Sequence, residues 1–365
     1  MSIEDKIREI EEEIKNTKYN KATQHHIGKL KAKLAQLREE LFKKSSSGGA
    51  GLGFGLKKHG DATAVLVGFP SVGKSTLLNQ LTNAESPVAA YDFTTLEVIP
   101  GMMSYRKIEV QILDLPGIIT GASIGKGRGK EVLSMARNAD LALIMVDAEK
   151  PKQLEKILEE FYKIGIRLDQ RKPKVSIKKT DRGGVKVMST VQLKKIDIRT
   201  ITSILNSYGV HNANVTLQED INEDQMIDVV AGNRTYIPSV LVVNKIDLVG
   251  GGVVEGIRKQ LRREFIGISA SKNLNIEAVR EGLYKKLDLM KVYLKKQGAK
   301  ADFEEPLVVK RGSTIEQVCE KLHSSFKDKF LYAKIWGKSA KYPGQRKGLD
   351  HILEEGDVVN IIKER

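Results

Sequence analysis

The segment 68–75, GFPSVGKS, constrains the fold of this chain more than any other stretch. It matches the pattern G-x-x-x-x-G-K-[ST] at every fixed position, with an apolar run at 65–67 before it and leucines at helical spacing after it. Gly68 and Gly73 allow the backbone to curl so that successive N–H groups point inward at an anion, beside the positive end of a helix dipole. The sequence therefore predicts a phosphate-binding loop between a buried strand and a helix.

Two side chains of this loop are expected to act on bound phosphate. Lys74 would contact the β- and γ-phosphates of a nucleotide, and the Ser75 hydroxyl would take one coordination position on Mg²⁺. Further contacts are expected from Gly68, Pro70, Ser71, Val72, Gly73 and Thr76. The alternative is a chance glycine-rich turn before a helix. It is disfavoured because strand and helix both lie where the motif requires them.

The composition is typical of a globular protein with two or three domains. The 365 residues are 41% hydrophobic and 29% charged. Cys319 is the only cysteine, which excludes an internal disulfide and fits a reducing compartment. No apolar run reaches the length of about 18 residues that a membrane span needs, and the N-terminal sequence is too charged for a secretory signal. We therefore expect a cytoplasmic protein, and a monomer, that does not enter a membrane.

The net charge of +15 favours a polyanionic partner. This charge exceeds what one nucleotide would need, and it is clustered along the chain rather than evenly spread. RNA or the ribosome is the partner class that we favour. The alternative is a basic, solvated surface without a specific partner.

The periodicity of apolar residues divides the chain into four regions. Two heptad-like stripes between residues 3 and 41 predict an antiparallel helical hairpin over 1–44, followed by a glycine- and serine-rich linker at 45–60. Strands and helices then alternate over 61–295. This alternation predicts an α/β domain with a mostly parallel sheet, helices on both faces and ligands at the carboxyl ends of the strands. The predicted elements are strands at 65–67, 108–113, 139–146, 240–243 and 265–268, a helix at 152–162 and a long closing helix at 276–295.

The pattern breaks between residues 165 and 236, which predicts a small α+β insert in this domain. The segments 175–179 and 185–189 alternate around a glycine-rich turn, which indicates a hairpin, and 193–208 is expected to be a helix. Short elements are expected at 214–217 and 226–230. The first half of the insert is strongly basic, with Arg167, Arg171, Lys172, Lys174, Lys178, Lys179, Arg182, Lys186, Lys194 and Lys195.

A separate small domain is expected at 302–365. Strands are predicted at 307–310, 331–336 and 358–362, with a helix at 314–325. This order of elements suggests a ubiquitin-like β-grasp fold.

Two short motifs follow predicted strands and complement the phosphate loop. Asp114 opens the segment DLPG at the end of the 108–113 strand, where its carboxylate can hold Mg²⁺ directly or through water. The N–H of Gly117 can then meet the γ-phosphate. Thr94 and Thr95 lie between the loop and this motif. Thr95 is the one we expect to close on Mg²⁺ and the γ-phosphate as a first switch, and the glycine-rich loop 118–130 is expected to be a mobile second switch.

A third motif indicates which base the bound nucleotide carries. Asn244, Lys245 and Asp247 belong to the segment NKID, which follows the 240–243 strand. A carboxylate at Asp247 can accept hydrogen bonds from the ring N–H and the exocyclic amine of guanine, an arrangement that adenine lacks. The segment containing Ser269 and Ala270 follows the 265–268 strand, where a backbone N–H can meet the guanine oxygen.

The combination of GFPSVGKS, YDFTTL, DLPGIITGASIGKGRGK and NKID resembles the Obg-related GTPases. The basic insert before NKID and the C-terminal β-grasp, a TGS domain, narrow this resemblance to the developmentally regulated GTP-binding protein family, in a short archaeal-type form. The resemblance covers nearly the whole chain. It implies a G domain interrupted by a split βαβ insert, GTP hydrolysis, and association with ribosomes and translation. RNA binding is also implied, with the basic insert as independent support.

Many small GTPases carry a water-orienting Gln directly after DxxG, but Ile118 occupies that position here. We therefore expect slow intrinsic hydrolysis. Relatives that lack this Gln use a monovalent cation, often potassium. Ser71 stands where the strict cation-dependent pattern has Asn, so stimulation by potassium and stimulation by a partner protein or ribosome contact both stay open. Two other functions also stay open: a related ATPase, and a scaffold that GTP only stabilises.

Overall fold

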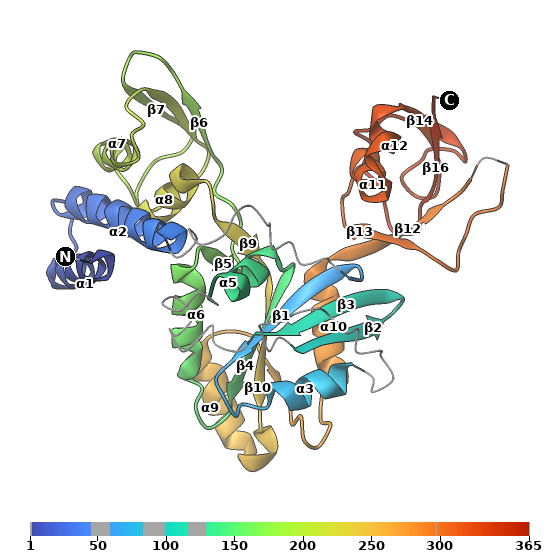
Figure 1. Ribbon diagram of the computed structural model, residues 1–365, viewed down its shortest axis with the longest axis horizontal. Coiled ribbons are helices and arrows are strands. Elements are labelled where there is room, and N and C mark those ends of the chain that lie inside the picture. Colours follow the sequence, from blue (N-terminus) through green and yellow to red (C-terminus); the bar gives the residue numbers. More distant parts are fainter. Residues whose placement is uncertain (1, 45–58, 83–98, 116–128, 297, 365) are drawn as a thin grey trace. The chain divides into compact units, whose positions relative to one another are not determined.

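The computed structural model describes residues 2–44, 59–82, 99–115, 129–296 and 298–364 (Figure 1). These residues form two compact units. One unit is drawn from the described residues within 1–55, 116–137 and 154–237, and the other from the described residues within 56–115, 138–153 and 238–365. In the described part of the chain, no helix combines the length and the apolar character that crossing a membrane requires.

The second unit is built on a six-stranded sheet with the order β11-β10-β4-β1-β3-β2. All neighbours are parallel except β2 and β3, which are antiparallel. The mostly parallel α/β sheet that the sequence predicts is therefore confirmed. Its strands are β1 (Ala62–Gly68), β2 (Ile99–Tyr105), β3 (Ile108–Asp114), β4 (Leu141–Asp147), β10 (Ser239–Asn244) and β11 (Ile266–Gly267).

Both faces of this sheet are buried. On one face Leu66, Ile112 and Leu143 pack in a single apolar cluster with helices α3 (Lys74–Leu81) and α10 (Ile276–Leu287). The alternate residues of the same strands, such as Val65 and Ile144, are just as inaccessible to solvent. This burial explains why β1 and β4 are continuous apolar runs rather than alternating ones. A 3₁₀ turn (Ile246–Leu248) and helix α9 (Gly251–Leu261) follow β10.

The C-terminal part of the second unit is a five-stranded sheet with the order β13-β12-β16-β14-β15. Its apolar core joins Val292, Ile335 and Val359 of the sheet to Ile315 and Cys319 of the main helix. Cys319 is therefore a buried core residue. The elements are β12 (Leu289–Leu294), β13 (Leu307–Lys310), α11 (Ile315–Leu322), α12 (Ser324–Asp328), β14 (Phe330–Trp336), β15 (Gln345–Lys347) and β16 (Val358–Lys363).

The predicted long helix at 276–295 is wrong in its second half. The helix ends at Leu287, and Asp288 adopts a left-handed backbone conformation with φ +48° that stops it. The next residues form β12, which pairs antiparallel with β13 and parallel with β16. Met290 and Val292 are fully buried in the C-terminal core, so tertiary packing overrides the local helical pattern. The C-terminal sheet thus begins at Leu289 rather than after residue 302.

The first unit contains the insert. Its three-stranded sheet has the order β6-β8-β7, and β5 pairs in parallel with β9 apart from it. The elements of the unit that follow the hairpin are α5 (Gly129–Asn138), α6 (Gln153–Lys163), β5 (Ile166–Leu168), β6 (Val175–Lys179), β7 (Val185–Ser189), α7 (Ile198–Ser207), β8 (Ala213–Leu217), α8 (Glu223–Ala231) and β9 (Thr235–Ile237).

The predicted hairpin of 175–179 and 185–189 is also wrong. β8 lies between these two strands, antiparallel to β6 and parallel to β7. Ala213, Val215 and Leu217 of β8 are all fully buried, whereas the inward residues of β6 and β7 are only partly covered. The most apolar strand takes the central position because only there is it covered along both edges.

One predicted member of the basic surface is absent from that surface. The side chain of Arg167 is 3% exposed and forms a bidentate ion pair with Asp228, at 2.6 and 2.7 Å. Arg234 also pairs with Asp228, at 2.9 Å. Arg167 therefore stabilises the interior of the insert, since a buried charge needs a partner.

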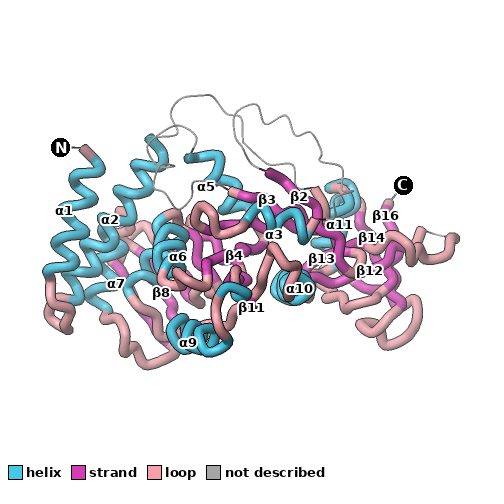
Figure 2. Tube along the Cα trace, turned by 90° about the horizontal axis from the view of Figure 1, so that it is seen from below, coloured by secondary structure: helices cyan, strands magenta, loops and turns pink. Residues whose placement is uncertain are grey.

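The predicted N-terminal hairpin is confirmed as helices α1 (Ile3–Asn16) and α2 (Gln24–Lys44), which lie side by side (Figure 2). The hairpin packs against the insert through α2. The buried Gln24 amide donates to Glu223 Oε1 and to the Lys195 carbonyl, both at 2.6 Å. A Cβ at Gly28 would lie 2.7 Å from Thr200 Cγ2 of α7, so this glycine allows the close approach. The hairpin and the insert consequently form one structural unit.

Candidate functional site

The phosphate loop has the conformation that its sequence predicts. β1 ends at Gly68, and an added Cβ there would lie 2.5 Å from the Met145 carbonyl oxygen, so only glycine fits against β4. Ser71 and Gly73 have positive φ angles of +61° and +99°. The first helical hydrogen bond of α3 runs from the Leu77 N–H to the Gly73 carbonyl. The N–H groups before Leu77 are therefore the ones that a helix leaves for an external acceptor.

Two side chains of the loop lie at the start of α3. Lys74 Nζ donates to the Phe69 carbonyl at 3.3 Å, which folds the lysine back over the loop. Ser75 is exposed in the first turn of the helix. This arrangement offers a cation and a hydroxyl to an anion bound at the helix terminus.

Asp114 is the last residue of β3, where it pairs in register with Leu66 of β1. It is 6% exposed, and its Oδ1 has no hydrogen-bond partner among the described residues. Burial raises the pKa of this carboxyl, and the nearby Lys74 cation partly opposes the shift. A buried carboxylate oxygen without a partner is costly unless a ligand satisfies it. Together with the Ser75 hydroxyl it supplies the oxygen donors that Mg²⁺ prefers.

Asn244 joins the phosphate loop to a second loop. Its Nδ2 donates to the Val72 carbonyl at 2.8 Å, and its Oδ1 accepts from the Ala270 N–H at 2.9 Å. The residue is 4% exposed, and a Cβ on Gly73 would lie 2.5 Å from its amide nitrogen. Asn244 was predicted to contact the ligand, and in the structure its side chain holds two other loops together.

Lys245 adopts a left-handed conformation with φ +66° and donates to Asp147 Oδ2 at 2.6 Å. Burial alone would raise the pKa of the Asp147 carboxyl, but hydrogen bonds from Lys245 and the Glu149 N–H hold that pKa below its ordinary value. Asp147 was not among the site residues predicted from the sequence. The available signal was its position at the carboxyl end of a buried strand, which is the edge where ligands bind.

Asp247 lies in the 3₁₀ turn that follows β10, with 11% of its side chain exposed. Its carboxylate is 3.2 Å from Lys272 Nζ. A hydrogen bond from the Ser269 side chain, and then one from Lys272, hold the pKa of this carboxyl below its ordinary value. The Ile246 N–H donates to the Ile268 carbonyl at 3.1 Å, which fixes this turn against the 269–270 segment. Lys272 is a second residue that sequence analysis missed.

The structure therefore brings the loop 68–76, Asp114, the 244–247 turn and the 269–270 segment to the carboxyl edge of one parallel sheet. Thr95, with Thr94 as the alternative, and Gly117 were also predicted to act here, and Ile118 was predicted to stand in place of a water-orienting Gln. All four lie outside the described residues.

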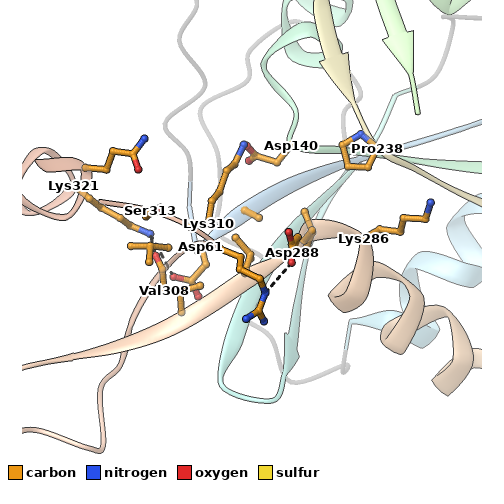
Figure 3. Close-up of a pocket in the computed structure, with 16 residues that line it drawn as sticks. Asp61, Asp140, Pro238, Lys286, Asp288, Val308, Lys310, Ser313 and Lys321 are labelled. Atoms are coloured by element: carbon orange, nitrogen blue, oxygen red, sulfur yellow. Dashed lines mark hydrogen bonds and ion pairs between the residues drawn. The ribbon is translucent and has the colours of Figure 1, made fainter. Parts of the chain in front are cut away.

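A second polar site lies at the opposite end of the strands. A cavity of about 650 Å³ adjoins the amino ends of β1 and β4 and is lined by β13 and α11. Lys310 and Lys321 lie 3.9 Å from Asp140 and Asp61 respectively (Figure 3). The carboxylates in this cavity face cations of the protein itself. We therefore interpret the cavity as a charged contact region between the two sheets rather than as a ligand site.

Comparison with known proteins gives matches along nearly the whole chain. Residues 63–179 match the family described as "50S ribosome-binding GTPase", 182–289 match "C-terminal region of MMR_HSR1 domain", and 290–363 match "TGS domain". The last match starts where β12 joins the C-terminal sheet.

Three relatives are similar over almost their full length. A GTP-binding protein of Methanocaldococcus jannaschii is 56% identical, covering 100% of this chain and 94% of the relative. GTP-binding protein 1 of Schizosaccharomyces pombe is 45% identical, with 99% of each chain covered. Developmentally-regulated GTP-binding protein 2 of Homo sapiens is 43% identical, with 100% of each chain covered.

Replacing Asn244 tests whether it positions the two loops. Asn244→Ala leaves the Val72 carbonyl and the Ala270 N–H without their partner, so we expect the free energy of unfolding to fall by about 1–3 kcal/mol. Urea titration followed by circular dichroism measures this change. Asn79→Ala, at an exposed position on α3, is the matched control and should leave the transition unchanged. Equal transitions for the two variants would contradict the positioning role.

Proposed function

The chain belongs to the developmentally regulated GTP-binding proteins, a family of GTPases, and we propose that its GTP turnover operates a switch that acts on ribosomal RNA. The observation that carries the nucleotide part of this proposal is the Asn244 amide. It joins the predicted phosphate loop to the segment after β11. A phosphate site and a base site held at a fixed separation suit one nucleotide that spans them.

In this proposal the phosphates bind the free N–H groups of residues 73–76, and Lys74 moves from the Phe69 carbonyl to the β- and γ-phosphates. Guanine binds beside the 244–247 turn. The ionised Asp247 accepts from the two guanine N–H donors, and the Ser269–Ala270 backbone meets the guanine oxygen. Lys245, held by Asp147, lies beside the base.

Mg²⁺ fits the donor set of Ser75 and Asp114, because Asp114 Oδ1 is buried without a partner. When bound, the ion neutralises charge that develops on the phosphate oxygens. Thr95 and the Gly117 N–H are proposed to complete the γ-phosphate contacts from the switches. Ile118 cannot orient water, so intrinsic hydrolysis is proposed to be slow and to depend on potassium or a partner. Equal turnover in potassium and sodium buffers would remove the cation from this account.

The RNA part of the proposal is supported by the open face of the insert. In the sheet register Lys178 and Lys186 flank Asn214, and both lysines are exposed. The opposite face of the same strands packs on α7 and α8. Two lysines on one solvent-facing row of a sheet place neighbouring positive charges on an open surface, as contact with a nucleic-acid backbone requires.

Asp114 provides the test of the magnesium and nucleotide site. Its pKa is raised in the folded protein, so its charged form opposes folding at neutral pH, and this penalty disappears as the pH falls below the ordinary value. Asp114→Asn removes the charge. We expect the nucleotide-free variant to be more stable than the parent at pH 7 by about 1 kcal/mol.

The same variant should lose the increase in melting temperature that GTP produces only in the presence of Mg²⁺. Asp140→Asn, a carboxylate at the opposite sheet edge, is the control and should keep that increase. A Mg²⁺-dependent shift that survives in Asp114→Asn would contradict the assignment.

The insert is tested by the salt dependence of RNA binding. Removing two phosphate contacts with Lys178→Gln and Lys186→Gln should lower the slope of log K against log salt by about two. Filter binding of total ribosomal RNA at increasing KCl measures this slope. Lys152→Gln, just before α6, with Lys156→Gln, on α6, makes the same change in net charge and should leave the slope near that of the parent. RNA binding that does not respond to salt would contradict the proposal.

A further inference from the structure

The C-terminal sheet has one face that its own helix does not cover. Met290, Val292, Ala333, Ile335 and Val359 point to the core beneath α11. Side chains alternate along a strand, so the residues between these point to the opposite face. The outer face is formed by β12, the residue after it, β14, β15 and β16. It carries Lys291, Tyr293, Lys295, Tyr332, Lys334, Trp336, Arg346, Val358, Asn360 and Ile362.

The strand register arranges these residues in rows. Tyr293, Val358 and Trp336 form one row, and Asn360, Lys334 and Arg346 form the next. Tyr293, Tyr332 and Trp336, the aromatic residues of the outer face, are only partly buried. Phe303, which is 58% exposed, extends the first row, with its ring centroid 4.9 Å from that of Tyr293. Rings from three strands or loops therefore share one surface.

Cationic side chains lie over two aromatic rings of the outer face, those of Trp336 and Tyr332. Lys295 Nζ is 4.5 Å from the centroid of the Trp336 ring, and Arg346 Cζ is 4.5 Å from that of Tyr332. None of the ten outer-face positions, all of which the structure describes, carries a carboxylate. The acidic residues nearest to this face in sequence are Asp357, which is buried directly before Val358, and Glu364, two residues after Ile362. Asp302, Glu304 and Glu305 lie around Phe303 in the loop after β12. The middle of the face therefore has positive charge next to aromatic rings.

We infer that this outer face binds a single-stranded segment of nucleic acid, with bases stacked on Tyr332 and Trp336 and phosphates beside Lys295, Lys334 and Arg346. Partly exposed aromatic rings on an open sheet, next to cations, are the combination that single-stranded binding proteins use. A protein ligand would use the rings but would have no general need for three neighbouring cations. The inference rests on the proposed action on RNA. It gives the protein a second RNA-binding surface, on the C-terminal sheet, besides the one proposed on the insert.

The cation–π pairs also have a purely structural interpretation, in which Lys295 and Arg346 only cover the rings. The two interpretations differ in what happens when a nucleic acid is added. A covering cation stays on its ring, whereas a binding surface exchanges ring–cation contact for stacking of a base on that ring. Trp336 is the only tryptophan of the chain, so its fluorescence reports on this face alone.

The experiment titrates the full-length protein with single-stranded oligoadenylate of about ten nucleotides, within the usual site sizes of such surfaces. We expect saturable quenching of Trp336 fluorescence. Tyr332→Ala should weaken binding by about tenfold, the loss of one stacked base. Leu331→Ala, at the neighbouring exposed position of β14, is the matched control and should bind like the parent.

The charge contribution is tested separately. Lys334→Gln should lower the salt slope of binding by about one, and Lys329→Gln, an exposed lysine outside the face, should not. Inorganic polyphosphate, which has charge but no bases, should compete weakly and should not quench Trp336.

Three results would overturn the inference: no quenching by the oligonucleotide, equal affinities of Tyr332→Ala and Leu331→Ala, or equal quenching by polyphosphate. If only the Lys178→Gln, Lys186→Gln variant loses RNA binding, the RNA part of the proposed function stands and this surface is not involved. If the parent protein binds neither ribosomal RNA nor the oligonucleotide, both fail together.

Discussion

The side-chain amide of Asn244 is the contact on which the rest of the candidate site depends. It is buried and uses both its donor and its acceptor on main-chain groups of two different loops. Neither loop belongs to a regular element at that point, and each therefore needs a fixed partner to keep one conformation. The amide supplies this partner from the end of a central strand. The proposed phosphate site at the first loop and the proposed base site at the second are thereby held at one separation.

The site is otherwise built from features that cost stability. Asp114 is a buried carboxylate with an unpartnered oxygen, and Ser71 and Lys245 have positive φ angles. These features persist because the surrounding sheet is buried on both faces and the strand register is fixed. Features of this kind concentrate at ligand sites, because a bound anion or cation supplies the missing interactions. At the opposite sheet edge, Asp140 and Asp61 already face lysines of the protein, so these carboxylates do not need a ligand to supply a partner.

Much of the fold and most of the site follow from local sequence. The glycines at 68 and 73, the apolar strand and the residues after each strand are short-range signals, and the structure places them at one sheet edge. The errors come from long-range packing. The segment 289–294 reads as helix but becomes a strand because β13 and β16 offer it pairing partners. β8 enters between β6 and β7 from 24 residues further along the chain, counted from Ser189 to Ala213. Arg167 looks like a surface cation until Asp228 is seen beside it. The docking of α2 on the insert had no sequence signal, because it depends on single residues such as Gln24 and Gly28.

The central claim is that Asp247 makes this site selective for guanine. Calorimetric titration of nucleotide-free protein with GDP and with ADP tests it most directly, with Asp247→Ala compared against Glu255→Ala, an exposed carboxylate on α9. The account predicts that the parent protein and Glu255→Ala bind GDP at least about 100-fold more tightly than ADP, and that Asp247→Ala loses this preference. Equal affinities of the parent protein for GDP and ADP, or an unchanged preference in Asp247→Ala, would contradict it.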